Sequence, residues 1–167
     1  DITCDVSPYS TTGSPLYLLI PAGARQAGFS ELFRRLDNPG ERRIITDLLK
    51  GSTLHYDRFI VTSAKIKTIV GKTLSRIAEE AGLEPEDALI ETIRANDGRV
   101  SIIGKTLSDE NTRKAAEYHA AIIASDGFGM AQEAGRSGDL THPRSFGAFP
   151  HFWHRFVERE KIVPPEL

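Results

Sequence analysis

The sequence of 167 residues has a single cysteine, Cys4, which cannot form a disulfide within the chain, so an oxidising secretory environment is not indicated. Its apolar runs are too short to cross a bilayer. It has no basic tail or stripe, and its formal net charge is −2. We therefore expect no membrane and no nucleic-acid partner. With no signal peptide recognisable, we predict a cytoplasmic protein.

Motifs for a complete metal or phosphate site are also missing. Neither His-x-His nor His-Glu-x-x-His occurs, and the two Gly-Lys-Thr triplets lack the upstream glycine of a phosphate-binding loop. His151 and His154 are three residues apart and share a helix face, but without a third ligand we predict surface histidines. Cys4 is predicted to be a small buried apolar residue, because nothing beside it would lower the pKa of its thiol.

The composition, 40% hydrophobic and 26% charged, is typical of a globular chain that buries a core. Short runs rich in Ile and Val resemble buried parallel strands, and they lie at 1–6, 57–64, 99–104 and 120–125. Helical spacing and capping residues predict helices within 28–36, 38–51, 71–82, 83–98, 107–119 and 149–161. This alternation predicts an α/β fold. In the last helix, we expect Trp153 and the phenylalanines around it to form core.

Two stretches that follow strand ends are predicted to be loops, 7–15 and 127–147. In α/β folds, loops after the carboxyl ends of strands build the functional site. Asp126 lies where the last strand stops, and Asp before Gly is either a turn former or an acid placed for chemistry. Arg144 lies on the second loop after Pro143. Its guanidinium is either a solvated surface group or a bidentate ligand for a carboxylate.

Four segments together resemble the N-acyl-D-amino-acid deacylase (D-aminoacylase) family of the amidohydrolase superfamily. They are "CDVSPYSTTGS", "GLEPEDALIETI", "IIASDGFG" and "THPRSFGAFPHFWHRFV", in the family's order and approximate spacing. The most specific combination is Ser125-Asp126-Gly127 followed by His142-Pro143-Arg144. The resemblance extends over nearly all of this chain.

The resemblance implies a metal-dependent (β/α)8 barrel, of which 1–6 and 120–125 would be the seventh and eighth strands. A complete barrel needs about 250 residues, so this chain would be a late segment of a longer enzyme, with an incomplete barrel. We accordingly predict a partial amidohydrolase barrel in 1–14 and 108–167. An inserted α/β subdomain would occupy 15–107.

The resemblance also implies an activity, hydrolysis of the amide bond of an N-acyl-D-amino acid with zinc as cofactor. Asp126 matches the family's catalytic general acid/base, and it is also a candidate ligand of a second, weaker metal. Arg144 matches the arginine that binds the substrate carboxylate, Ser14 matches a serine that helps to hold it, and Tyr9 matches an aromatic residue at the substrate. The family's principal zinc ligands are not in this chain, so we expect the chain alone to be inactive.

Two departures from the family pattern affect the expected substrate pocket. Ser7-Pro8-Tyr9 stands where the family usually shows Tyr-Pro-Tyr, and the segment before Ser14 is one residue longer. They suggest an altered acyl or side-chain specificity. Two other interpretations stay open. One is a non-catalytic α/β protein-interaction module in which Asp126 is a turn residue, and the other is an amidohydrolase acting on a cyclic amide.

A piece of a barrel would expose strand edges that a whole barrel covers. Open edges pair readily with other chains. We therefore expect self-association through the two barrel strands, or repacking of these strands against the insertion.

Overall fold

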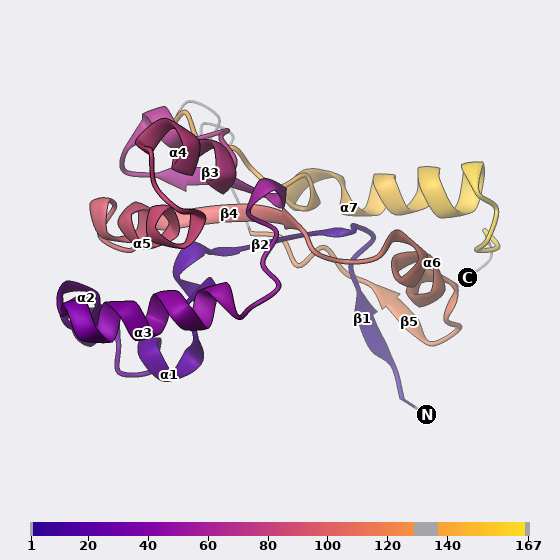
Figure 1. Ribbon diagram of the computed structural model, residues 1–167. Helices are drawn as coiled ribbons and strands as arrows, with labels where there is room; N and C mark the ends of the chain where they lie inside the picture. The colour runs from indigo at the N-terminus through magenta and orange to yellow at the C-terminus, as the bar shows by residue number, and fades with distance from the viewer. Residues whose placement is uncertain (1, 129–136, 166–167) are drawn as a thin grey trace. The chain divides into compact units, whose positions relative to one another are not determined.

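The computed structural model describes residues 2–128 and 137–165 (Figure 1). The chain divides into two compact units. Unit 1 comprises Asp1–Thr12, Lys105–Gly135 and Thr141–Leu167, and unit 2 comprises Gly13–Gly104 and Arg136–Leu140. Their assignment to a partial barrel and an insertion stays a prediction. The fold is mixed α/β, and its described strands include both parallel and antiparallel pairs.

Unit 1 contains a two-stranded parallel sheet, in which β1 (Cys4–Val6) lies beside β5 (Ala121–Ile123) in Figure 1. The register pairs Cys4 with Ala121. Its helices are α6 (Asp109–Glu117) and α7 (Arg144–Phe152), and α7 continues into a π-helical segment, Trp153–Arg159. A small hydrophobic cluster forms around Phe156, which is fully buried, and the buried residues Ala116 and Val163 belong to it.

Unit 2 contains the three-stranded sheet, with strand order β2-β4-β3. β2 is Thr11–Pro15, β3 is Phe59–Ala64 and β4 is Val100–Lys105, and the ends of β2 and β4 extend into unit 1. The helices of this unit are α1 (Ala22–Arg25), α2 (Phe29–Asp37), α3 (Pro39–Lys50), α4 (Leu74–Ala81) and α5 (Pro85–Ala95). Short 3-10 helices lie at Leu16–Leu19, Tyr56–Arg58 and Lys67–Ile69.

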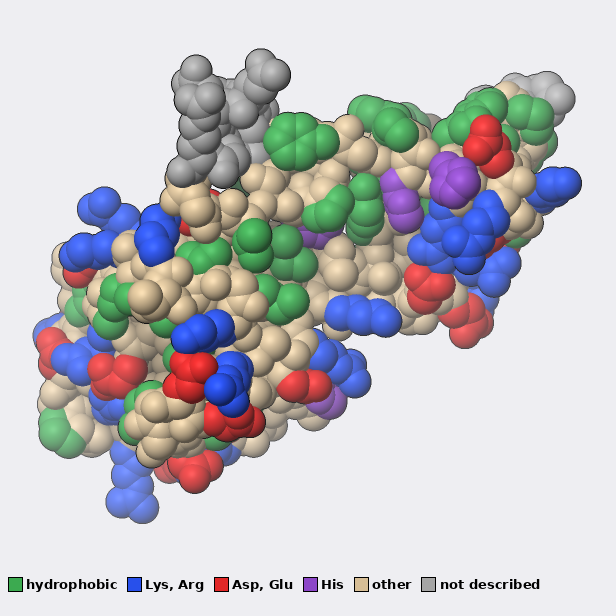
Figure 2. All heavy atoms as spheres, turned by 90° about the horizontal axis from the view of Figure 1, so that it is seen from above, with side chains coloured by type: hydrophobic (Ala, Val, Ile, Leu, Met, Phe, Trp, Pro, Cys, Tyr) green, Lys and Arg blue, Asp and Glu red, His purple; other side chains and the backbone are tan. Residues whose placement is uncertain are grey.

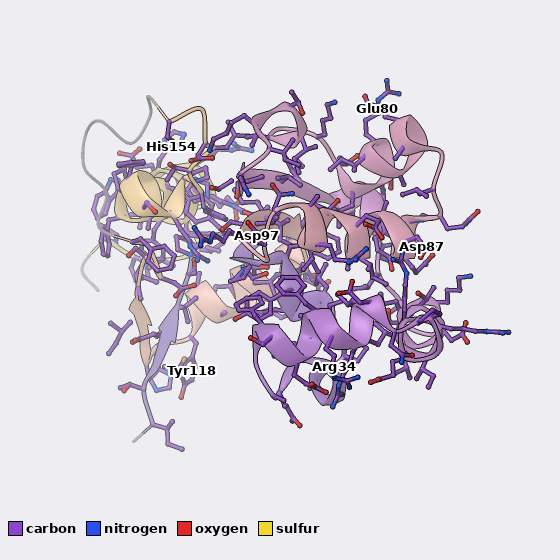
Figure 3. The ribbon with its side chains drawn as sticks, turned by 90° about the vertical axis from the view of Figure 1, so that its left-hand side faces the viewer. Arg34, Glu80, Asp87, Asp97, Tyr118 and His154 are labelled. Carbon is purple, nitrogen blue, oxygen red and sulfur yellow. The ribbon has the colours of Figure 1, made fainter. Side chains whose placement is uncertain are left out.

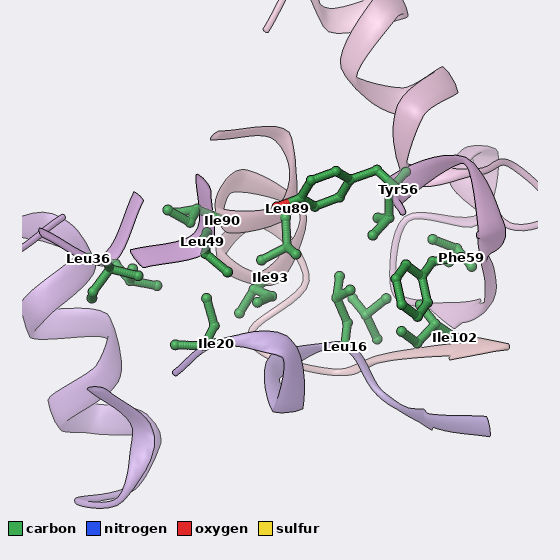
Figure 4. Close-up of a cluster of buried hydrophobic side chains, with 14 of the residues drawn as sticks. Leu16, Ile20, Leu36, Leu49, Tyr56, Phe59, Leu89, Ile90, Ile93 and Ile102 are labelled. Atoms are coloured by element: carbon green, nitrogen blue, oxygen red, sulfur yellow. The ribbon is translucent and has the colours of Figure 1, made fainter. Parts of the chain in front are cut away.

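The core of unit 2 is built mainly from aliphatic side chains, with Tyr56 and Phe59 among them, that the helices and the sheet contribute together (Figure 4). Leu89, Ile90 and Ile93 from α5 are fully buried, as are Leu16 before α1 and Leu49 on α3. Burying one such side chain contributes about 1.5–3 kcal/mol, so these positions supply a large part of the stability of the unit.

Two sequence predictions about strands are wrong. β3 and β4 pair antiparallel, with an irregularity between Val61 and Ser63, although their composition resembles that of parallel strands. Every other residue of β4 is buried, from Val100 to Gly104, so its burial alternates. The segment 7–15, predicted as a loop, contains β2. Short apolar runs specify a strand, but its partner and direction depend on the rest of the chain.

Helix predictions agree better with the structure, because the capping residues act locally. Asn38 accepts hydrogen bonds from the backbone of Gly40 and Glu41 at the start of α3, and Ser108 accepts one from Asn111 at the start of α6. Gly82 ends α4 in the left-handed conformation, with a φ of 64°. The last predicted helix starts earlier than expected, at Arg144.

Two predictions of burial are also wrong. Cys4 is exposed, because in the described part of the chain β1 pairs with β5 alone and nothing covers its side chain. Trp153 and Phe149 were expected to form core, yet each is about half exposed or more, whereas Phe156 of the same predicted helix is fully buried as expected. In Figure 2, hydrophobic side chains are visible over the α7 segment, beside histidine and basic side chains. No helix in the described residues is long and apolar enough to cross a membrane.

Ion pairs form within α2 and between α2 and α3 of unit 2. Glu31 on α2 binds Arg34 at 2.7 Å and Arg35 at 2.9 Å, and Arg34, labelled in Figure 3, also binds Glu41 of α3 at 2.9 Å. Hydrogen bonds from Arg34 and Arg35 lower the pKa of Glu31 to about 2. The carboxylate thus stays charged in the folded protein at a pH where it takes up a proton in the unfolded chain.

We expect Glu31→Gln to make the stability of the chain less sensitive to acid. A lowered folded-state pKa stabilises the protein above the unfolded-state pKa, and this contribution is lost as the pH falls through the folded-state value. Between about pH 5 and pH 2, the range in which these carboxyl groups titrate, the free energy of unfolding of E31Q should therefore decrease less than that of the wild type. Asp57→Asn, which removes an exposed carboxylate from the same unit, is the control; equal slopes for E31Q and D57N would contradict the prediction.

We expect the chain to associate with itself through the β1–β5 pair. Ile122 on β5 is 53% exposed and Ile2 before β1 is 82% exposed, so apolar side chains accompany the open sheet. Sedimentation velocity should show a mass that rises with concentration, and Ile122→Lys should reduce this rise. Leu83→Lys, at an exposed position between α4 and α5, is the control. A monomer at every concentration would contradict the expectation.

Candidate functional site

Asp126 lies three residues beyond the end of β5, in a turn that its own sequence favours. Its φ is 50°, in the left-handed region that Asp tolerates better than most residues. The hydroxyl of Ser125 accepts a hydrogen bond from the backbone of Gly127 at 3.1 Å, which closes the turn. The Asp126 side chain is 74% exposed, so its carboxylate is open to solvent. The turn and an accessible acid therefore coexist at this residue.

Arg144 is the first residue of α7, and its side chain is only 9% exposed. Nη1 of Arg144 binds Oδ2 of Asp126 at 2.9 Å. A buried guanidinium needs a counter-charge, and a cation at a helix N-terminus is disfavoured by the helix dipole, so Asp126 offsets both costs. The structure thus brings together two of the predicted site residues. The arginine predicted to bind a substrate carboxylate binds a carboxylate of this chain.

Gly127 permits this approach. A Cβ at this position would lie 2.9 Å from Cα of Ser145 and 3.2 Å from the carbonyl oxygen of Arg144, both of them backbone atoms of α7. A side chain here would push the turn away from the helix. Gly147, one turn further along α7, is similarly close to Tyr9, whose hydroxyl would lie 3.2 Å from a Cβ. These contacts give a physical reason for the glycines in the Ser-Asp-Gly and Arg-Ser-Phe-Gly segments.

His142, which the sequence singles out only as part of His142-Pro143-Arg144, is buried. It is 7% exposed, and its Nδ1 accepts a hydrogen bond from the backbone N–H of Arg144 at 3.1 Å. Its Nε2 lies 2.9 Å from Oγ1 and 3.2 Å from the carbonyl oxygen of Thr11. Burial is the largest influence on His142 and lowers its pKa. The sequence signal for this residue was its place directly before Pro143-Arg144.

Tyr9 lies between two histidine rings. Its ring stacks on His151 of α7 at 4.5 Å with an angle of 8°, and it meets the edge of His142 at 5.4 Å and 85°. Burial raises the pKa of the Tyr9 hydroxyl and lowers that of His151. Tyr9 therefore belongs to the same cluster as Arg144. Ser14 lies half-buried on β2 and belongs to unit 2.

The described residues contain no group of three or more His, Cys, Asp or Glu side chains that could hold a metal ion. His154, one of the histidines considered for a metal pair, instead binds Glu158 at 3.2 Å, and His151 stacks on Tyr9. Asp126 pairs with Arg144, whose positive charge disfavours a metal cation at the same carboxylate. These residues alone do not fit a zinc site.

No protein-family model matches this chain, and no curated protein matches it. Solved structures do match it. The N-acyl-D-glutamate deacylase of Bordetella bronchiseptica, solved with zinc and a phosphonate inhibitor that mimics the tetrahedral intermediate, is 16% identical, with a TM-score of 0.63. The match covers 99% of this chain and 26% of that chain. The chain has a fold similar to part of a D-aminoacylase.

Two further structures of D-aminoacylase lead to the same conclusion. One defines a novel subset of amidohydrolases and the other concerns the role of a binuclear metal centre. Both are 19% identical, with TM-scores of 0.61, and both matches cover 99% of this chain and 26% of the other. At this identity the similarity concerns the fold alone. The resemblance predicted from the sequence therefore agrees with the structural neighbours, while the roles of Asp126, Arg144, Ser14 and Tyr9 stay predictions.

We expect Gly127→Ala to separate Asp126 from Arg144 and to destabilise unit 1. The added methyl would meet backbone atoms of α7, which cannot move aside as a flexible side chain can. Overpacking of this kind costs about 1–3 kcal/mol in the free energy of unfolding, measured by denaturant titration. Gly23→Ala in α1, where a Cβ meets nothing within 4 Å, is the control and should be neutral or stabilising. Equal stability of G127A and the wild type would contradict the assignment.

Proposed function

We propose that this chain is part of an amidohydrolase that cleaves the amide bond of N-acyl-D-amino acids, contributing the general acid/base and the binding site for the substrate carboxylate. The observation that carries the proposal is the pairing of the exposed Asp126 with the buried Arg144 at the start of α7. The fold similarity to D-aminoacylases supports the reaction class. The chain spans 26% of the length of these structures, so the activity belongs to the longer protein.

Arg144 is suited to bind a carboxylate because its side chain is buried and its position is fixed by α7. A guanidinium offers several N–H donors in one plane, so it can bind a second carboxylate beside that of Asp126. Binding of the substrate carboxylate would hold the α-carbon at one orientation and favour one configuration at that carbon. Tyr9 would contact the substrate from the same cluster. Ser14 is proposed as a further contact of the carboxylate.

Asp126 is suited to move a proton because its carboxylate is exposed to solvent. As general base it would accept a proton from the attacking water, and as general acid it would pass that proton to the leaving amine. Its neighbour Arg144 keeps the carboxyl group of Asp126 oriented in both steps. We propose that the principal zinc ligands lie in other parts of the protein, and that this chain alone neither binds zinc tightly nor hydrolyses amides.

In the full-length protein that contains this chain, Asp126→Asn should lower kcat by about 10²–10⁴-fold, since loss of a general acid/base has effects of this size. The amide oxygen of Asn can still accept a hydrogen bond from Arg144, so the fold should be retained. Arg144→Lys should instead raise KM roughly 10–100-fold, the effect of losing a charged hydrogen bond. Steady-state kinetics with an N-acetyl-D-amino acid, together with circular dichroism, measure both effects.

The control is Asp57→Asn, at an exposed carboxylate of unit 2, which should leave the kinetics unchanged. Unchanged turnover in a folded Asp126→Asn variant would contradict the catalytic role. It would leave Asp126 as a turn residue and counter-charge. Turnover by the 167-residue chain with stoichiometric zinc would contradict the proposal that the chain alone is inactive.

A protein-interaction module is the second candidate function, and one observation favours it. Ile44 and Leu48 on α3 are 61% and 54% exposed and border a hollow that Pro21 and Ala24 also line. Exposed apolar side chains beside a hollow are typical of a surface that binds another protein. The third interpretation, hydrolysis of a cyclic amide, is less well supported, because the buried Arg144 favours a substrate with a free carboxylate.

A further inference from the structure

We propose that His142 is a positioning residue that holds Arg144 and Tyr9 in the arrangement needed to bind the substrate carboxylate. This proposal rests on the proposed function of Arg144. It concerns a residue to which neither the sequence motifs nor the structural neighbours assign a role. Three described contacts of the His142 ring carry it.

The first contact determines which ring nitrogen carries the proton. The backbone N–H of Arg144 points to Nδ1 of His142 at 3.1 Å, and an N–H can only donate, so Nδ1 must be an unprotonated acceptor. The proton of the neutral ring is then on Nε2. From there it can be donated to Thr11, whose hydroxyl and carbonyl oxygens lie 2.9 Å and 3.2 Å away. Both nitrogens of this buried ring are thereby used.

The second contact is at the start of α7. The first N–H groups of a helix have no partner within the helix and usually bind the side chain of the N-cap residue. The N-cap residue here is Pro143, which makes no side-chain cap hydrogen bond. The ring of His142 takes over this task for the first N–H, that of Arg144. The backbone of Arg144 is consequently tied through His142 to Thr11, in the segment that follows β1.

The third contact is with Tyr9. Its ring meets the edge of the His142 ring at 5.4 Å and is held from the other side by His151. Both histidines come from the chain segment that carries Arg144. Their rings therefore hold Tyr9 in a fixed position relative to Arg144. A change in the His142 ring should therefore affect the orientation of both residues at once. Asp126 keeps its own support, the turn closed by Ser125.

The test compares substitutions that keep one half of the ring's hydrogen bonding. In His142→Asn, the amide oxygen can take the place of Nδ1 and accept from Arg144. In His142→Gln, the amide lies nearer the place of Nε2 and can reach Thr11, and His142→Ala removes both. Each variant of the full-length protein is assayed with an N-acetyl-D-amino acid and with its carboxamide, which lacks the carboxylate. His119→Asn, at an exposed histidine of unit 1, is the control.

We expect H142A to raise KM for the acid about tenfold or more while changing the kinetics with the carboxamide little, so that the preference for the acid falls. H142N should restore most of the preference, and H142Q should restore less. A merely structural role would lower both activities together. Equal losses for the acid and the carboxamide in all three variants, or no difference between H142N and H142A, would overturn the proposal.

Two outcomes separate this proposal from the proposed function. If the wild-type protein does not prefer the acid to the carboxamide, the carboxylate role of Arg144 fails and this proposal is overturned with it. If the wild type prefers the acid and H142A keeps that preference, only the role of His142 is overturned. The tautomer is tested without any activity: ¹⁵N NMR of the 167-residue chain should show Nδ1 of His142 unprotonated and Nε2 protonated, and the reverse would also overturn the proposal.

Discussion

The candidate site depends on the burial of one cation. Arg144 lies at the start of α7 with its side chain almost completely buried, and a guanidinium in such a place is stable only with an opposing charge nearby. Asp126 provides that charge from the turn after β5. The acid is itself exposed, so the pair combines a fixed cation with an accessible anion. This combination suits a site that binds an anionic substrate and transfers protons.

Close packing at two glycines accompanies the ion pair. The turn of Asp126 rests on α7 at Gly127, where no side chain would fit. Gly147 allows Tyr9 the same approach on the next turn of α7. His142 then satisfies the first N–H of the helix. The Ser-Asp-Gly and His-Pro-Arg segments, both predicted to lie in a loop, thus bring the residues after β5 into contact with the N-terminus of α7.

Helices could be predicted well because their signals are local. Asn38 and Ser108 act on residues two or three positions away, and Gly82 ends α4 by its own conformational freedom. The strands β3 and β4 were found but given the wrong direction, since pairing involves residues about 40 positions apart. β2 was missed because "TTGSP" has no apolar run. Cys4 and Trp153 were predicted to be buried on the assumption that other elements cover them.

The sequence by itself determined most of the longer helices and the α/β class, and it singled out Asp126 and Arg144 as candidate site residues. It did so because capping residues and the Ser-Asp-Gly and His-Pro-Arg segments are short patterns. Only the tertiary structure decided that Arg144 is buried, that it binds Asp126 across 18 residues of sequence, and that His142 supports it. Burial and pairing depend on segments that are distant in the chain and that meet only when it folds.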